Sequence, residues 1–104
     1  MKIIDESCLQ SFRDKLFCEL CEKVRKVEPH HVFGRGFGGG NRLDIPINIV
    51  ALCRKCHQAF HTGHICRSTI LRLVAKREGM TVDEIETEIY RLRRITPRGR
   101  KPDG

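Results

Sequence analysis

Two Cys-x-x-Cys pairs constrain the fold of this chain more than any other feature of its sequence. The first pair is Cys18 and Cys21, and the second is Cys53 and Cys56. Four thiolates with this spacing can complete a tetrahedral structural zinc site. The sequence therefore predicts a small fold in which one zinc ion links two distant segments.

The size and composition of the chain also favour a metal-stabilised domain. It has 104 residues, no Trp and an aromatic content of 6%, so its apolar core is thin, and such chains often need a metal or a disulfide. A structural Zn²⁺ can contribute on the order of 10–16 kcal/mol to folding. We expect a single domain over residues 1–104, with a zinc-stapled core over about 18–63, C-terminal helices over about 66–95 and a basic tail over 97–104.

The sequence has the features of a protein from a reducing compartment. The opening segment MKIIDESCLQ is too short and too charged for a secretory signal, and no apolar run is long enough to span a bilayer. We therefore expect a cytoplasmic protein without a membrane partner, in which Cys-x-x-Cys pairs bind metal rather than form disulfides. Cys8 and Cys66 lie outside the pattern and are expected to be ordinary thiols, with Cys8 facing the core.

Positive charge is concentrated around and after the histidines. The formal net charge is +7, and by segment it is zero over residues 1–28, +3 over 29–64, +3 over 65–80, −4 over 81–90 and +5 over 91–104. This distribution suits a polyanionic partner such as DNA. The alternative is a basic surface that is simply solvated.

Capping signals and apolar periodicity predict four helices and two short strands. Ser7 and Gln10 form a capping-box pattern, and Leu9, Phe12 and Leu16 share one helical face. The expected elements are a helix over 7–17, a strand over 24–27 leading into the histidines, a strand over 45–52, and helices over 54–62, 68–76 and 82–92.

The last helix carries the clearest signals. Thr81 and Glu84 form a second capping box, and Gly79 is a natural stop for the helix before it. Its apolar stripe comprises Val82, Ile85, Ile89 and Leu92. The stripe is expected either to pack on the zinc core or to form a dimer face.

A glycine-rich segment follows the first histidines. Residues 34–41 contain five glycines in eight positions, which is typical of a flexible hairpin loop. Alternatively, the loop carries Arg35 and Arg42 to a phosphate group, where a guanidinium can bind in a bidentate manner. Arg35 could equally be a solvated loop arginine.

The histidines form a pattern of their own. His57 and His61 are four positions apart on a predicted helix and therefore share one face, as two ligands of one divalent metal do. Alternatively, one of them completes the zinc site or lies at the surface. His30 and His31 are adjacent on a predicted strand and point to opposite faces, so one can be the third ligand and the other a general base. The haem-attachment pattern Cys53-x-x-Cys-His is set aside, because covalent haem of that type requires export.

These segments resemble a known family when they are taken together. The runs CELC, EPHHVFGR, PINIVALC and CRKCHQAFH occur in this order over residues 18–61, and they are similar to HNH endonucleases of the ββα-metal superfamily, of the phage and bacterial type with a four-cysteine structural zinc. The residues that name the motif would be His31, Asn48 and His57. The resemblance implies an α+β fold with a small zinc-stapled ββα-metal core and flanking helices.

The resemblance also implies a role for each matched residue. His31 would be the general base, Asn48 would pin the hairpin loop so that His31 faces the attacking water, and Glu28 would orient a ligand imidazole. One catalytic divalent metal, which could be Mg²⁺, Mn²⁺, Ni²⁺ or Zn²⁺, would be bound by His30, His57 and His61. The structural zinc would be bound by Cys18, Cys21, Cys53 and Cys56. Arg35 and Arg42 are the candidates for binding the phosphate.

The function implied is a metal-dependent DNA endonuclease. It would hydrolyse phosphodiester bonds by nicking or double-strand cleavage, leave 5′-phosphate and 3′-hydroxyl ends, and act as a monomer or homodimer in a bacterial or phage-infected cell. A competing hypothesis is a non-catalytic zinc module that binds DNA or another protein. That hypothesis accounts for the cysteines but not for the four histidines that accompany Asn48.

Overall fold

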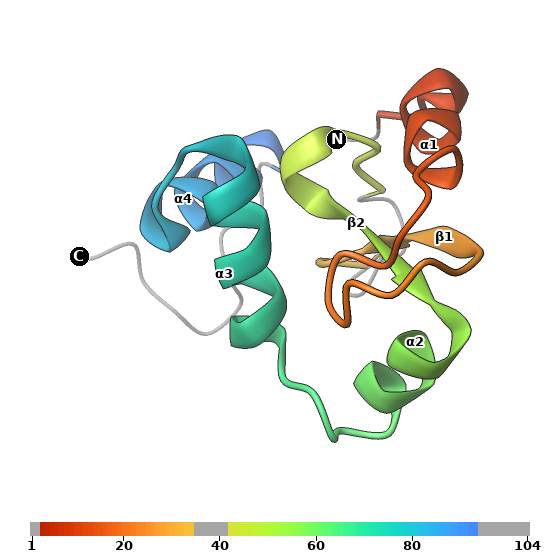
Figure 1. Cartoon of the computed structure of the whole chain (residues 1–104). Helices are drawn as coiled ribbons and strands as arrows, with labels where there is room; N and C mark the ends of the chain where they lie inside the picture. Colours follow the sequence, from red (N-terminus) through yellow and green to blue (C-terminus); the bar gives the residue numbers. More distant parts are fainter. Residues whose placement is uncertain (1–2, 35–41, 94–104) are drawn as a thin grey trace.

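The chain folds as an α+β structure in which helices surround a two-stranded antiparallel sheet (Figure 1). A computed structural model describes residues 3–34 and 42–93. In chain order the elements are α1 (Glu6–Arg13), β1 (Val27–His31), the 3₁₀ turn η1 (Pro46–Asn48), β2 (Ile49–Cys53), α2 (Arg54–His61), α3 (Arg67–Glu78) and α4 (Val82–Arg93). Within the described ranges, no helix combines the length and the apolar character needed to cross a membrane.

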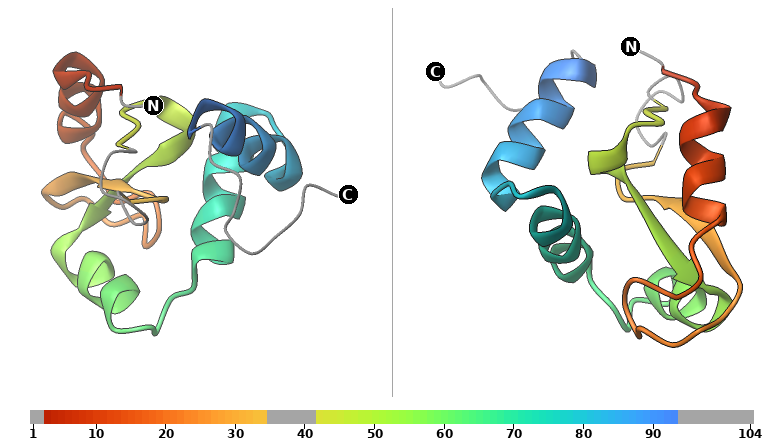
Figure 2. Two further views of the ribbon diagram at one scale, coloured as in Figure 1. Left: turned by 180° about the vertical axis from the view of Figure 1, so that it is seen from behind. Right: turned by 45° about the horizontal axis from the view of Figure 1, so that its top comes forward.

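The hairpin of β1 and β2 forms the centre of the molecule. Val27 pairs with Cys53 at one end of the ladder, and His31 pairs with Ile49 at the other. Every residue of β2 is buried, because α1 and α2 lie on opposite sides of the hairpin and α3 packs beside it, with α4 against α3 and η1 (Figures 1 and 2). A strand covered on both faces has no polar side, which explains the continuous apolar run in its sequence.

The first helix differs from its prediction at both ends. It begins after Asp5, whose side chain accepts a hydrogen bond from the backbone N–H of Cys8, so Asp5 and not Ser7 is the N-cap. The helix ends at Arg13, and Leu16 lies beyond it with 76% of its surface exposed. The predicted apolar face is therefore reduced to Leu9 and Phe12, which are buried.

The two cysteines outside the Cys-x-x-Cys pairs have different surroundings. Cys8 is partly buried against the core, and Cys66 is exposed.

Both strands begin later than predicted. Val24 forms only an isolated β-bridge with Phe17, and the strand β1 runs from Val27 to His31. Pro46 opens a 3₁₀ turn instead of a strand, because its fixed φ angle and missing N–H suit the first position of a helical turn. β2 consequently starts at Ile49.

The two C-terminal helices follow the sequence signals closely. Gly79 has a φ angle of 68° and caps α3 in the left-handed region, which glycine adopts without strain. Thr81 and Glu84 make both bonds of the predicted capping box, at 2.9 and 3.0 Å. Ile85 and Ile89 are fully buried, so the stripe of α4 packs on the core of this chain.

Arg77 of α3 joins this helix pair to the rest of the fold. Its guanidinium donates to both carboxylate oxygens of Glu19 at 2.7 and 2.9 Å, and to the carbonyls of Pro46 and Ile49 at 2.5 and 3.0 Å. It also lies 4.9 Å from the ring centre of Phe12. One side chain therefore connects α3 to α1, to the turn η1 and to β2.

Replacing Arg77 by lysine should destabilise the fold although the charge is kept. A lysine cannot reproduce the planar fork of donors, and each buried acceptor that loses its donor costs about 1–3 kcal/mol. Urea denaturation in the presence of zinc measures the change in the free energy of unfolding. The matched control is Arg72→Lys on the exposed side of α3, which should change stability by less than about 0.5 kcal/mol. Equal stability of the two variants would contradict the role given to Arg77.

Candidate functional site

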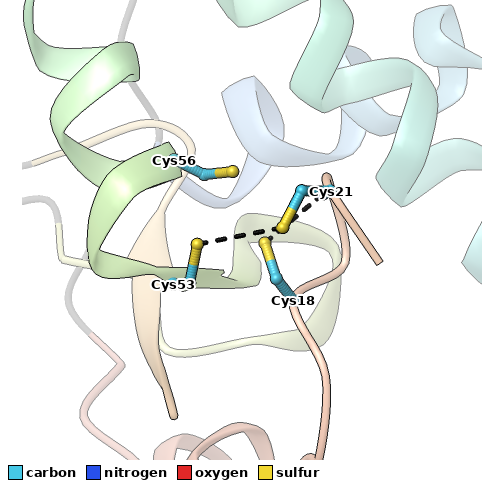
Figure 3. Close-up of side chains that lie close together, drawn as sticks. All are labelled: Cys18, Cys21, Cys53 and Cys56. Carbon is cyan, nitrogen blue, oxygen red and sulfur yellow. Dashed lines mark hydrogen bonds between the residues drawn. The ribbon is translucent and has the colours of Figure 1, made fainter. Parts of the chain in front are cut away.

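The four cysteines converge from two segments that are distant in the sequence. Cys18 and Cys21 lie in a tight turn, while Cys53 ends β2 and Cys56 lies in the first turn of α2. Figure 3 shows the four thiols pointing toward one another, and all four sulfur atoms lie within 4.8 Å of each other. The four thiols could therefore bind a structural zinc.

The distances within this cluster suit a tetrahedral metal site. A Zn–S bond of about 2.3 Å corresponds to sulfur atoms about 3.8 Å apart in a tetrahedron, and the Sγ atoms of Cys21 and Cys53 are 3.9 Å apart. The backbone N–H of Cys21 points at the Sγ of Cys18 at 3.5 Å. Glu22 follows with a φ angle of 62°, and this left-handed residue lets the chain turn tightly around the cluster.

The pKa values of the thiols are compatible with the binding of a cation. Burial opposes ionisation of Cys53, but hydrogen bonds from the backbone and thiol of Cys56 lower the pKa of Cys53 to about 6. Burial and the neighbouring thiols raise the pKa of Cys56 well above its usual range. Without a bound cation, one thiol would ionise at the expense of the other. A divalent metal would allow all four to bind as thiolates.

Three histidines form a second cluster between β1 and α2. The ring centre of His30 lies 3.6 Å from that of His57 and 5.6 Å from that of His61, and one nitrogen of each ring lies within 4.8 Å of the others. His57 and His61 lie one turn apart on α2, as the sequence predicts. This group could hold a metal ion with three nitrogen ligands, which is the ligand number of many catalytic zinc sites.

His30 contributes a buried nitrogen atom to this cluster. Its Nε2 atom is buried and has no hydrogen-bond partner within the described residues, although buried polar groups are nearly always paired. Burial, together with the nearby His57 and His61, lowers the pKa of His30 to about 4. Burial also lowers the pKa of His57. A neutral imidazole is the form of histidine that binds metal.

His31 points to the opposite face of β1. There its Nε2 atom lies 2.7 Å from Oδ1 of Asp44, a carboxylate with only 1% of its surface exposed. Arg42 donates to both oxygens of the same carboxylate, at 3.0 and 2.9 Å. Asp44 was not among the residues that the sequence singled out. The one signal for it is an acidic residue between Leu43 and Ile45 in an otherwise apolar run.

Asn48 ties together the two ends of the loop that separates the strands. Its Oδ1 atom accepts the N–H of Phe33 at 2.8 Å, and its Nδ2 atom donates to the carbonyls of Phe33 and Leu43 at 3.1 and 3.0 Å. The side chain is completely buried. These bonds fix the chain two residues after His31 and one residue before Asp44.

The remaining predicted site residues have different surroundings. Glu28 is exposed on β1, and its charge raises the pKa of His57 against the larger effect of burial. Among the described residues no hydrogen bond joins Glu28 to an imidazole. Arg42 has two of its nitrogens engaged by Asp44, and Arg35 lies outside the described residues.

A pocket opens beside His31. It has a volume of about 280 Å³ and is lined by Leu9, Arg13, Glu28, Pro29, His31 and Arg42. Its charged lining side chains are Arg13, Arg42, His31 and the acidic Glu28. Arg13 is paired with Glu6 and Arg42 with Asp44.

Comparison of the chain with protein-family models, with curated proteins and with solved structures finds no match.

Proposed function

We propose that this chain is a metal-dependent DNA endonuclease of the HNH type with a ββα-metal core. The observation that carries the proposal is that His30 and His31 lie on opposite faces of β1 and have different partners. His30 faces the imidazoles of α2, and its neighbour His31 faces a buried carboxylate beside a pocket that two arginines help to line. Adjacent strand residues point in opposite directions, so one short strand supplies both a metal ligand and a base.

The proposed chemistry is hydrolysis of a phosphodiester bond. His31 takes a proton from a water molecule, and Arg42 and Arg13, in the same pocket, stabilise the charge on the phosphate. A divalent metal held by His30, His57 and His61 would supply Lewis-acid stabilisation of the phosphate and of the leaving 3′ oxygen. The four cysteines would hold a separate structural zinc next to the helix that carries two of these ligands.

A plasmid-cleavage assay tests the proposal. Protein treated with EDTA, under conditions that leave one zinc per chain, should be inactive on supercoiled DNA and should recover activity when Mg²⁺, Mn²⁺, Ni²⁺ or Zn²⁺ is added. Imidazole ligands favour nickel and zinc over magnesium, so Ni²⁺ or Zn²⁺ should act at lower concentration than Mg²⁺. His64→Ala is the matched control, because His64 is exposed and outside the cluster. DNA binding without cleavage under all four metals would instead support the non-catalytic zinc module.

Binding to DNA should depend strongly on salt. Arg54 and Lys55 are exposed in the first turn of α2, the helix that carries His57 and His61. Each phosphate contact contributes a slope of roughly −0.9 to the plot of log affinity against log salt. Replacing both residues by glutamine should make the slope less negative by up to about 2. Arg91→Gln is the control, because Arg91 is already paired with Glu88. An affinity for DNA that does not change with salt concentration would refute binding through phosphate contacts.

A further inference from the structure

Asp44 is the most completely enclosed charged group in the described residues. It is 1% exposed and accepts three hydrogen bonds, from Nε and Nη2 of Arg42 and from the backbone N–H of Asp5. Its Oδ1 atom also lies 2.7 Å from Nε2 of His31. A buried charge is retained in this way only when donors surround it.

The carboxylate remains ionised at neutral pH. Burial alone would raise the pKa of Asp44, but hydrogen bonds from Arg42, His31 and the Asp5 N–H outweigh burial and lower it to about 2. An ionised carboxylate has no proton to share. The 2.7 Å contact with His31 therefore requires the proton of that bond to sit on Nε2 of the imidazole.

We propose that Asp44 is a positioning residue that holds His31 as the Nε2–H tautomer, so that Nδ1 is the atom that accepts the proton of the attacking water. The catalytic part of this inference rests on the nuclease function proposed above. The water proton moves to Nδ1 and the hydroxide oxygen bonds to phosphorus. The bond from phosphorus to the 3′ oxygen breaks with its electron pair on that oxygen, which takes a proton from solvent. Asp44 then faces a positively charged imidazolium, which it stabilises.

The hydrogen-bond geometry predicts what asparagine would do at this position. If the amide oxygen of Asn takes the place of Oδ1, its NH₂ group faces two donors, the Asp5 N–H and Nη2 of Arg42. If the amide is turned the other way, its NH₂ group faces only one obligatory donor, Nε of Arg42. The second orientation is favoured, because it has fewer opposed donors. It places an N–H against Nε2 of His31, which must then become an acceptor, and the imidazole proton moves to Nδ1.

The test combines NMR with kinetics on the zinc-loaded protein. Long-range ¹⁵N–¹H correlation spectra identify which imidazole nitrogen carries the proton, and His31 is assigned by the loss of its signals in His31→Gln. We expect the proton on Nε2 in the wild type and on Nδ1 in Asp44→Asn. The cleavage rate at saturating DNA should fall by about 10²–10⁴-fold in Asp44→Asn, with unchanged DNA affinity and metal content. Asp83→Asn, an exposed substitution with the same change in charge, should keep both the wild-type tautomer and the wild-type rate.

The possible failures can be told apart. A proton on Nδ1 in the wild type overturns the inference, and this measurement needs no variant, so it decides the matter even if Asp44→Asn does not fold. An unchanged tautomer in folded Asp44→Asn, or a wild-type cleavage rate in that variant, also overturns it. If the tautomer changes as expected but the wild-type protein cuts no DNA, the proposed nuclease function fails, while the assignment of Asp44 as the residue that fixes His31 stands.

Discussion

Cys56→Ser should abolish cooperative folding of this chain. Cys56 and the other three cysteines bring the turn after α1 to the junction of β2 and α2, and structural zinc sites can supply on the order of 10–16 kcal/mol. Whole domains are stable by only about 5–15 kcal/mol, so losing one ligand removes a large share of the total. Thermal denaturation followed by circular dichroism should show no cooperative transition. Elemental analysis should find close to one tightly held zinc per wild-type chain and much less in the variant.

The exposed Cys66 provides the control for this experiment. Cys66→Ser removes a thiol outside the cluster and should keep the zinc content without lowering the melting temperature, because serine is a favourable N-cap for α3. Cys18→Ser should behave like Cys56→Ser. A Cys53→Ser variant that melts like the wild type would count decisively against a structural metal at this site.

Substitutions of His30 and His31 should each reduce cleavage activity, but for different reasons. His31→Ala should keep its metals and its affinity for DNA but lose about 10²–10⁴-fold in cleavage rate, the usual effect of removing a general base. His30→Ala should weaken binding of the second metal, because the His30 ring lies 3.6 Å from that of His57 and 5.6 Å from that of His61. Raised metal concentration should then recover part of the activity of His30→Ala and none of the activity of His31→Ala.

Metal titration and single-turnover cleavage separate these outcomes. His57→Ala and His61→Ala should group with His30→Ala, and His64→Ala should resemble the wild type, because His64 lies outside the cluster. If His31→Ala loses the second metal while His30→Ala retains it, the two neighbours have exchanged roles. Cleavage by His31→Ala at the wild-type rate would remove the general base from the proposed mechanism.

The sequence predicts those parts of the fold that depend on local patterns. The cap of α4 at Thr81 and the stop of α3 at Gly79 were predicted correctly, because each depends on residues within one turn. The first helix was predicted poorly. Asp5 and Ser7 are both good caps, and Asp5 has a further contact, because its backbone N–H donates to Asp44, which lies 39 positions away. Rules that use only neighbouring residues cannot predict a contact over that distance in the sequence.

The same distinction applies to the candidate site. The spacing of the cysteines and of His57 and His61 groups residues that the structure brings together, and strand alternation predicts that His30 and His31 point apart. Asp44 could not be found in this way, because its partner His31 lies 13 positions away across a loop. Arg77 was missed for the same reason, since its carbonyl partners are about 30 positions away. A single buried acidic or basic residue becomes significant only when the contacts made by folding are known.

Cys56 and His57 are consecutive residues of one helix, each belonging to a different cluster. This adjacency has a consequence for how the protein would be assembled in a cell. The helix that carries two of the three imidazoles is held against the sheet by the cysteine cluster, so the histidine cluster should form only in chains that have already acquired zinc. Metal would then load in a fixed order, with the thiolates filled before the imidazoles. For the nuclease proposed above, cleavage of DNA would then depend on zinc having first been bound by the cysteines.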